Sequence, residues 1–218
     1  MAMAARERGY KMLAITDHTS GLGVVQGMTP EAVKKQGKEI DQARDELGES
    51  IHILKGAEVE IKTDGTLDYP DEVLATLDIV IGSIHSGLRQ PREKITERLI
   101  KAMHNPHVDF IGHPTGRLFP DRAPSDLDMD KVLATAAESG VVMEINAHPA
   151  RLDLDDVHAK RAIEMGINLT INTDAHTDTD MDLMHFGVST ARRAWVEADD
   201  VINTWSVGKL IKWLKSRG

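Results

Sequence analysis

Residues 168–176 read NLTINTDAH, the pattern of an apolar strand that ends in two metal-binding side chains. Asp174 and His176 stand two positions apart, so both side chains can lie on one side of the strand end. Four other hydrophobic runs of the chain end in the same kinds of residue, at Asp17-His18, Glu58, His85 and His113. Because parallel strands bring their C-terminal ends to one mouth of a barrel, the repetition predicts a shared metal site there.

Strand-like runs rich in Ile, Val and Leu alternate with helical patterns along the chain. The predicted strands cover residues 12–16, 51–61, 77–85, 108–113, 141–147 and 168–174. The predicted helices cover residues 1–9, 30–47, 91–104, 128–139 and 153–165, and most are bounded by Pro or Gly signals. An open doubly wound sheet also fits this alternation, but polar residues at the ends of many strands favour a barrel. We therefore predict one α/β domain over residues 1–218, with a barrel architecture.

The composition excludes several classes of protein. Charged residues make up 28% of the 218 residues and the formal net charge is −9, which argues against autonomous, sequence-independent DNA binding. The chain has no cysteine, so disulfides and thiolate metal sites are excluded. No apolar run approaches the roughly 18 residues that a membrane-spanning helix needs. These features predict a cytoplasmic protein whose metal ligands are nitrogen and oxygen atoms.

Spacing alone leaves one choice among the candidate ligands open. Glu58 and Glu60 lie on the same face of their strand, since side chains alternate along a strand. Glu58 follows the apolar run directly and suits a bridging role between two cations, so it is the preferred ligand. Asp17, beside His18, is predicted to orient a ligand or to cap the next loop.

Polar residues after the fourth and fifth strands are candidates for other roles. Arg117 follows His113 in a loop and is placed to meet an anionic group such as phosphate. Glu144 and Asn146 end the fifth strand, and either suits ligand support or substrate binding. His148 is a weaker ligand candidate. The other histidines are predicted to be structural: His52, His104, His107, His158 and His185.

Imidazole and carboxylate ligands without sulfur suit zinc, manganese or iron. Several such ions close together generate hydroxide at neutral pH and clamp a phosphoryl group. The sequence shows no Ser–His or Cys–His arrangement that competes as a nucleophile. The residues alone therefore favour metal-dependent hydrolysis.

The strand-end motifs resemble those of the PHP (polymerase and histidinol phosphatase) family, whose members are trinuclear metal phosphoesterases on a distorted seven-stranded (β/α) barrel. The matching motifs are Thr16-Asp17-His18, Glu58, Ser83-Ile84-His85, Gly112-His113-Pro114 and Asp174-Ala175-His176. Further stretches resemble the C-terminal PHP domain of bacterial family X DNA polymerases. They are residues 56–59, 112–117, 144–147, 151–154, 187–188 and 191–195.

This resemblance implies a TIM-like (β/α)7 barrel and a 3′–5′ exonuclease that processes DNA ends in repair by a metal-activated hydroxide. It implies that Mn²⁺, Zn²⁺ or Fe²⁺ is bound by His18, Glu58, His85, His113, Asp174 and His176. Glu58 would bridge, and Glu58, Asp174 and His176 would form the catalytic group. Arg117 and Arg151 would hold phosphate, while Asp17 and Asn146 would support the ligands. The implied partners are a DNA 3′ end and polymerase domains; the alternative is a histidinol-phosphatase-like enzyme for small phosphorylated molecules.

The chain departs from the family pattern at its start. Family members open with a strand that carries an Asp-x-His-x-His motif, followed by a further aspartate ligand, whereas residues 1–9 predict a helix. We therefore expect a truncated barrel without its first strand and with one or two metals instead of three. We also expect weak or absent phosphodiesterase activity, down to an inactive metal-binding fragment. Two open barrel edges predict homodimerisation or strand exchange.

Overall fold

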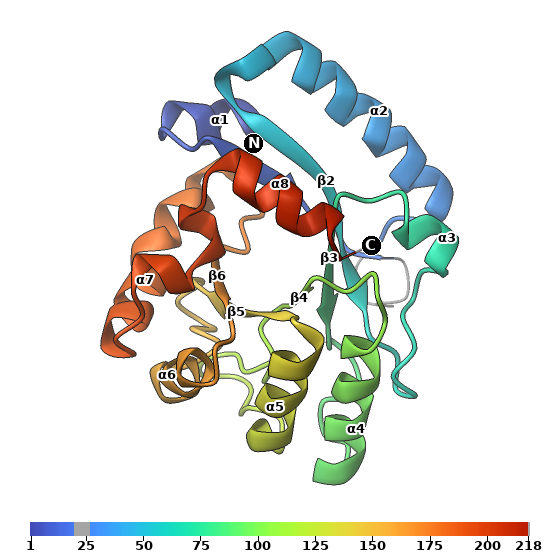
Figure 1. Ribbon diagram of the computed structural model, residues 1–218. Coiled ribbons are helices and arrows are strands. Elements are labelled where there is room, and N and C mark those ends of the chain that lie inside the picture. The colour runs from blue at the N-terminus through green and yellow to red at the C-terminus, as the bar shows by residue number, and fades with distance from the viewer. Residues whose placement is uncertain (20–26, 218) are drawn as a thin grey trace.

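The computed structural model describes residues 1–19 and 27–217, and its centre is a curved sheet of six parallel strands (Figure 1). Neighbours in the sequence are also neighbours in the sheet. The strands are β1 (Met12–Ile15), β2 (His52–Glu60), β3 (Ile79–Ser83), β4 (Phe110–Ile111), β5 (Val142–Asn146) and β6 (Leu169–Asn172). Each of the six predicted strands is present, and the α/β barrel-like architecture is confirmed.

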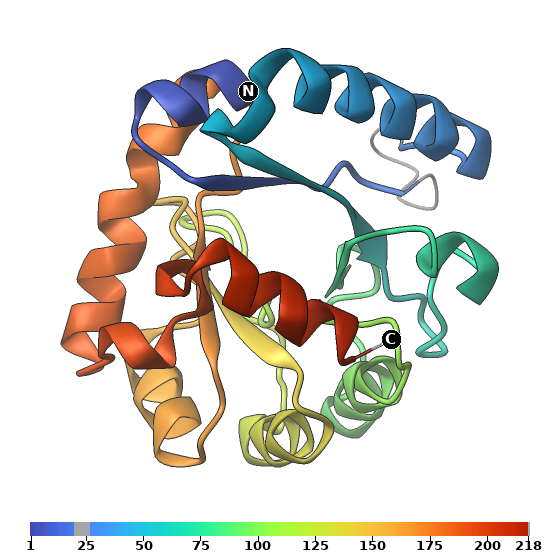
Figure 2. The same cartoon turned by 45° about the horizontal axis from the view of Figure 1, so that its top comes forward.

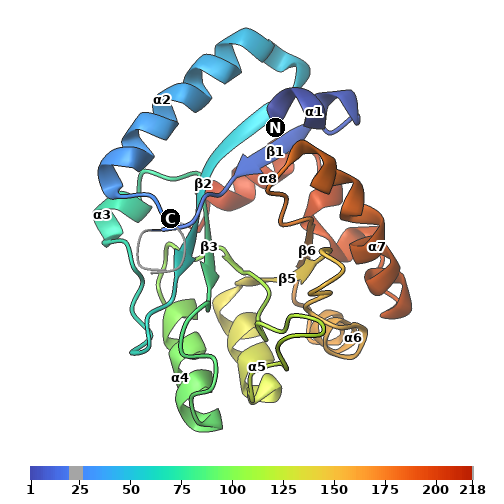
Figure 3. The same ribbon diagram turned by 180° about the vertical axis from the view of Figure 1, so that it is seen from behind.

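The connecting helices stand around the outer side of the sheet (Figure 3). The α-helices are α1 (Ala2–Glu7), α2 (Pro30–Leu47), α3 (Asp71–Leu74), α4 (Arg92–Met103), α5 (Met129–Ser139), α6 (Asp156–Glu164), α7 (Met184–Arg193) and α8 (Val207–Lys215). Short 3-10 turns lie at η2 (Gly48–Ser50), η3 (Asp178–Leu183), η4 (Ala198–Asp200) and η5 (Ile202–Thr204). Across the described ranges, none of these helices combines the length and apolar character that crossing a membrane requires.

The sheet is buried on both faces, which explains why its strands read as continuous apolar runs. On the outer face, side chains such as Val59 and Ile61 pack with Leu99 and Leu133 of the surrounding helices in the larger core. On the inner face, Leu54 and Phe110 meet α8, and Figure 2 shows this helix lying across the strands. The rings of Phe110 and Trp213 stack there with centroids 6.1 Å apart. The first halves of the strands thus pack under α8, and their polar ends lie beyond it.

Several elements are shorter than the sequence pattern predicts, and for two of them the structure shows the cause. The strand expected at residues 108–113 forms a ladder only at Phe110–Ile111, since the chain turns at His113, whose φ is +26°. The helix expected at residues 153–165 begins at Asp156. Residues 153–154 instead continue the pairing of β5: the Asn146 N–H donates to the Asp153 carbonyl, and the Leu154 N–H donates to the Glu144 carbonyl. Asp155 then caps the helix by accepting from the His158 N–H. Both corrections bring loop residues toward the strand ends.

The ladder of described strands is open between β1 and β6, the first and last strands in the sheet order. A cavity of about 660 Å³ lies between them, lined by residues 12–18 on one side and 170–176 on the other. Part of the β6 edge is covered, because the side-chain amide of Asn203 accepts from the Ile171 N–H and donates to its carbonyl. The polar strand ends therefore face a hollow and not a packed interior.

Candidate metal centre

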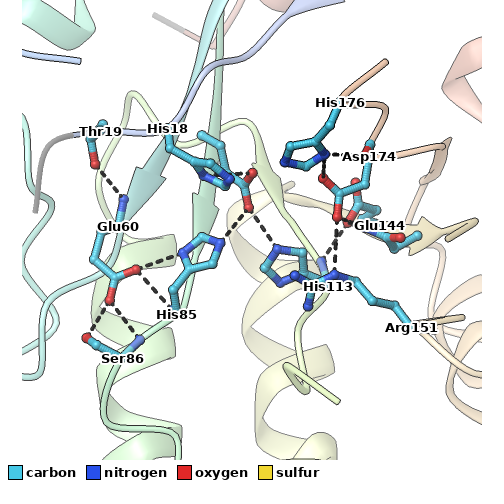
Figure 4. Close-up of polar contacts among 12 residues, drawn as sticks. His18, Thr19, Glu60, His85, Ser86, His113, Glu144, Arg151, Asp174 and His176 are labelled. Carbon is cyan, nitrogen blue, oxygen red and sulfur yellow. Dashed lines mark hydrogen bonds and ion pairs between the residues drawn. The ribbon is translucent and has the colours of Figure 1, made fainter. Parts of the chain in front are cut away.

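The strand ends bring the predicted ligands together around one carboxylate. His18 follows β1, Glu58 lies near the end of β2, and His85 and His113 follow β3 and β4. The register places His18 beside Glu58: the Thr19 N–H donates to the Glu58 carbonyl, and the Glu58 N–H donates to the Asp17 carbonyl. Figure 4 shows the histidine rings grouped at these ends. Separate βα units thus build one site.

Glu58 is the centre of this group. Its carboxylate oxygens lie 3.2 Å from His18 Nδ1, 3.1 Å from His85 Nε2 and 2.8 Å from His113 Nε2. The ring centroids of His18 and His85, and those of His85 and His113, are each 5.0 Å apart. Glu58 is only 8% exposed and His113 only 3%. Strand alternation left Glu58 and Glu60 equal, and the geometry assigns the central position to Glu58.

The buried charges shift the ionisation of the group strongly. Burial acts to raise the pKa of Glu58, but His113 and His85 outweigh it and hold that pKa well below its usual range. Burial acts to lower the pKa of His85, yet Glu58 and Glu60 raise it to about 9. Burial lowers the pKa of His18. The carboxylate therefore stays ionised, which is the form that binds a cation.

The donor set fits a divalent metal ion. One ligand atom from each of His18, Glu58 and His85 lies within 4.8 Å of the other two. Among the described residues, His18 Nδ1, His85 Nε2 and His113 Nε2 are buried without a hydrogen-bond partner, although each lies close to Glu58. Buried polar atoms without partners are costly unless a ligand satisfies them. Imidazole nitrogen and carboxylate oxygen are the atoms that Zn²⁺ and Mn²⁺ accept.

Asp174 and His176 reach the group from the end of β6. The His176 ring centroid lies 6.0 Å from that of His18, and its side chain is 68% exposed. Asp174 has a φ of +53°, in the left-handed region that aspartate tolerates better than most residues other than glycine. Its carboxylate accepts from Asn146 Nδ2 at 3.1 Å and from Arg151 Nε at 3.1 Å. Asp174 and His176 thus border the centre on the side where Glu144 and Arg151 lie (Figure 4).

The residues predicted to support the ligands behave differently. Asn146 holds Asp174, as expected for a supporting residue. The Asp17 carboxylate accepts from Gln36 Nε2 of α2, and among the described contacts it meets no ligand. Glu144 accepts from the His113 N–H at 2.6 Å and from Asn172 Nδ2 at 2.9 Å, and burial raises its pKa to about 7. Of the two roles considered for Glu144, its contact with His113 corresponds to the support of a ligand residue.

The two predicted phosphate contacts also differ in their surroundings. Arg117 donates through Nε to the Arg151 carbonyl at 2.6 Å and through Nη2 to the Leu152 carbonyl, and its Nη1 lies 3.8 Å from Asp155. Its guanidinium therefore holds the loop after β5. Arg151 pairs with Asp174 through Nε, while its buried Nη1 has no hydrogen-bond partner within residues 1–19 and 27–217. Arg151 thus has a free donor beside the centre.

Sequence reasoning left Glu60 as the alternative to Glu58 and did not identify Arg98 as part of this site. Glu60 lies 2.8 Å from His85 Nδ1, on the side of the ring away from Glu58, and Arg98 Nη2 lies 3.3 Å from Glu60. Alternation along β2 indicated that Glu60 shares a face with Glu58. Arg98 lies on α4, 38 positions after Glu60 in the sequence. Sequence spacing therefore does not indicate that the two side chains meet.

Comparisons with known proteins agree with this geometry. The family model described as PHP domain matches residues 1–148. The chain is 47% identical over 215 residues to the DNA polymerase/3′-5′ exonuclease PolX of Bacillus subtilis (strain 168), covering 99% of this chain but 38% of that protein. It is 33% identical over 226 residues to a probable phosphatase of Thermoanaerobacter sp. (strain X514), covering 99% of this chain and 86% of that protein.

A solved structure shares the fold. The histidinol phosphate phosphatase of Lactococcus lactis subsp. lactis Il1403, complexed with zinc, L-histidinol and phosphate, superposes with a TM-score of 0.64 over 89% of this chain and 86% of that chain. The sequence identity is 14%, so this likeness concerns the fold alone. The family match covers more than half of the chain, and it coincides with the strand ends that carry His18, Glu58, His85 and His113. The chain therefore belongs to the PHP domain family.

Proposed function

We propose that this chain is a divalent-metal-dependent phosphoesterase domain that processes DNA 3′ ends, as the 3′–5′ exonuclease part of a family X polymerase does. The observation that carries the proposal is the Glu58 carboxylate, buried among three histidines that come from three other strand ends. The similarity to PolX of Bacillus subtilis supports DNA as the substrate and polymerase domains as the partners. Because the chain spans 38% of that relative, both stay proposals.

The residues have distinct roles in this proposal. Glu58 would bridge the cations held by His18, His85 and His113, and Asp174 and His176 would complete the ligand set. A divalent cation, when bound, supplies Lewis-acid chemistry toward water and a phosphoryl group. Asn146 keeps the Asp174 carboxylate turned toward the centre. We assign the phosphate contact to Arg151, whose Nη1 is unpaired, and the support of its loop to Arg117.

The second candidate is a phosphomonoesterase for small phosphorylated molecules. Its support is the match over nearly the whole length of relatives named probable phosphatases, together with the formal charge of −9. A third candidate function is the binding of metal ions without catalytic turnover. We propose Mn²⁺ or Zn²⁺ as the metal, with Fe²⁺ as a further candidate, and the cytoplasm as the location.

The decisive experiment compares two substrates with and without metal. A 3′-recessed oligonucleotide and histidinol phosphate are each incubated with the protein in Mn²⁺, Zn²⁺ or chelator, and the metal content is measured. We expect weak metal-dependent release of nucleotides from the oligonucleotide, lost in Asp174→Ala, because that change removes a proposed ligand and the partner of Arg151. Turnover of histidinol phosphate alone would favour the second candidate. A protein that stays free of metal after supplementation would refute the metal centre itself.

We further propose that the open edges of β1 and β6 support homodimerisation. Unpaired strand edges present backbone donors and acceptors that another chain can pair with. Asn203 already covers part of the β6 edge, so pairing through β1 is the expected mode. Light scattering coupled to size-exclusion chromatography should give twice the chain mass at micromolar concentration. A single monomeric species over that range would contradict this expectation.

A further inference from the structure

We propose that Glu60 is a positioning residue, which with Arg98 holds the His85 ring so that Nε2 faces the metal centre. This inference rests on the proposed function, because it concerns how one ligand of the centre is oriented. The relevant network lies behind the ring, away from Glu58, and Figure 4 shows Glu60 with His85 and Ser86 on that side.

Glu60 gathers several donors on one buried carboxylate. Oε2 accepts from the His85 N–H at 3.0 Å and lies 2.8 Å from His85 Nδ1. Oε1 accepts from the Ser86 N–H at 3.2 Å, from Ser86 Oγ at 2.6 Å and from Arg98 Nη2 at 3.3 Å. The side chain is 2% exposed. A carboxylate with these donors cannot turn without breaking several hydrogen bonds in a place that water does not reach.

The same contacts define which nitrogen of His85 faces the centre. A neutral histidine that binds a cation carries its one proton on the nitrogen that does not face the cation, and an ionised carboxylate beside that nitrogen accepts from it. That nitrogen is Nδ1, and the opposite nitrogen, Nε2, lies 3.1 Å from Glu58. A ring held in this way presents the Nε2 lone pair to a cation, which is how carboxylates commonly orient histidine ligands.

Arg98 holds the carboxylate from behind. It is 2% exposed on α4, donates through Nε and Nη2 to the Ile61 carbonyl, and donates through Nη1 to the Ser86 carbonyl at 2.8 Å and to Gln90 Oε1 at 3.1 Å. Its partners are the residue that follows Glu60 and two residues of the segment after β3. Arg98 therefore ties the end of β2 to the loop that carries His85.

His85 differs in this respect from the other histidines around Glu58. In the described part of the chain, His113 Nδ1 is buried without a hydrogen-bond partner, and the carboxylate beside the His18 ring is that of Glu58 itself. Only His85 among these three has a second carboxylate on its far side within the described ranges. The pair of Glu60 and Arg98 is thus specific to one ligand.

Another carboxylate–arginine pair in the chain serves as a matched control, because it separates positioning of His85 from simple stabilisation of the fold by Glu60 and Arg98. Asp109 and Arg217 form a second carboxylate–arginine pair, with Nε 3.3 Å from Oδ1, and Asp109 accepts from the backbone N–H of Val80. This pair lies at the start of β4, away from the strand ends. The variants to compare are therefore Glu60→Met with Arg98→Met, and Asp109→Met with Arg217→Met. Replacing both partners avoids leaving one buried charge unpaired.

The first measurement is ¹⁵N–¹H histidine NMR of the metal-free protein at about pH 10, where neutral imidazole shows which nitrogen bears the proton. We expect His85 in the Nδ1–H form in the unchanged protein and in the Asp109/Arg217 variant, and a mixture of tautomers in the Glu60/Arg98 variant. The second measurement is zinc affinity by competition with a chromophoric chelator. We expect an affinity about 10- to 100-fold weaker in the Glu60/Arg98 variant, and no change in the control.

Glu60→Gln separates orientation from charge and also serves if the double variant does not fold. The amide oxygen that it introduces can still accept from Nδ1, so positioning predicts a zinc affinity between those of the unchanged protein and the Glu60/Arg98 variant. An affinity equal to that of the Glu60/Arg98 variant, or a tautomer unaffected by every Glu60 change, would overturn the inference. Failure of the unchanged protein to bind zinc would instead count against the proposed function, while the tautomer measurement would still test the role of Glu60.

Discussion

Glu58→Gln is expected to abolish tight binding of divalent metal ions and, with it, phosphoester hydrolysis. The Glu58 carboxylate is the charged group that His18, His85 and His113 share, with distances of 2.8 to 3.2 Å. The amide removes the negative charge and one of the two equivalent oxygens. Changes to residues that merely support metal ligands weaken binding about 10- to 100-fold, so loss of the central ligand should exceed about 100-fold.

Thermal unfolding with added zinc measures this directly. Zinc at about 100 times its Kd should stabilise the unchanged protein by about 2.7 kcal/mol, because it binds the folded state. The Glu58→Gln protein should show no such increase. Glu97→Gln, at an exposed position on α4, serves as the matched control and should retain the full effect. An undiminished zinc response in Glu58→Gln would mean that the histidines alone hold the metal.

Gly56→Ala is expected to destabilise the protein by about 2 to 3 kcal/mol, because the added methyl group has no room. A Cβ at Gly56 would lie 2.5 Å from Ile79 Cγ2, 2.8 Å from Thr16 Cγ2 and 3.0 Å from the Ile79 carbonyl oxygen. The last of these is backbone of the neighbouring strand, which cannot move without disturbing the β2–β3 pairing at this position. The close approach of β1, β2 and β3 therefore depends on glycine here.

Gly37→Ala is the matched control for this change. Gly37 lies within α2, and a Cβ there would meet only the Lys55 side chain, at 3.8 Å. This substitution should stabilise the protein by about 0.5 to 1 kcal/mol, since alanine favours a helix interior over glycine. Urea unfolding should move the midpoint in opposite directions for the two variants at similar m-values. An unchanged midpoint for Gly56→Ala would show that the strands can separate locally without cost.

The order of elements could be predicted from sequence because apolar runs buried on both faces of a parallel sheet are visible in any window of the chain. The lengths of the helices and strands were harder to predict from sequence. The β4 ladder covers only Phe110–Ile111, and the chain turns at His113. The positive φ of this residue cannot be predicted from its being a histidine. Residues 153–154 read as the start of a helix but pair with β5, since backbone groups at the mouth of the site compete for them.

The sequence itself specifies which residue types end the strands. It therefore also predicts a nitrogen- and oxygen-ligated centre at one end of the sheet. Strand direction places every strand end at the same mouth, whatever the details of packing. Only the tertiary structure assigns different contacts to residues that local spacing cannot distinguish. Glu58 and Glu60 share one face of β2, yet Glu58 faces three histidines while Glu60 faces the back of His85 and Arg98. Arg117 and Arg151 both follow strand ends, yet carbonyls of a neighbouring loop bind Arg117 and leave Arg151 beside Asp174. These choices depend on contacts between residues far apart in the chain, and such contacts exist only once the sheet has curved.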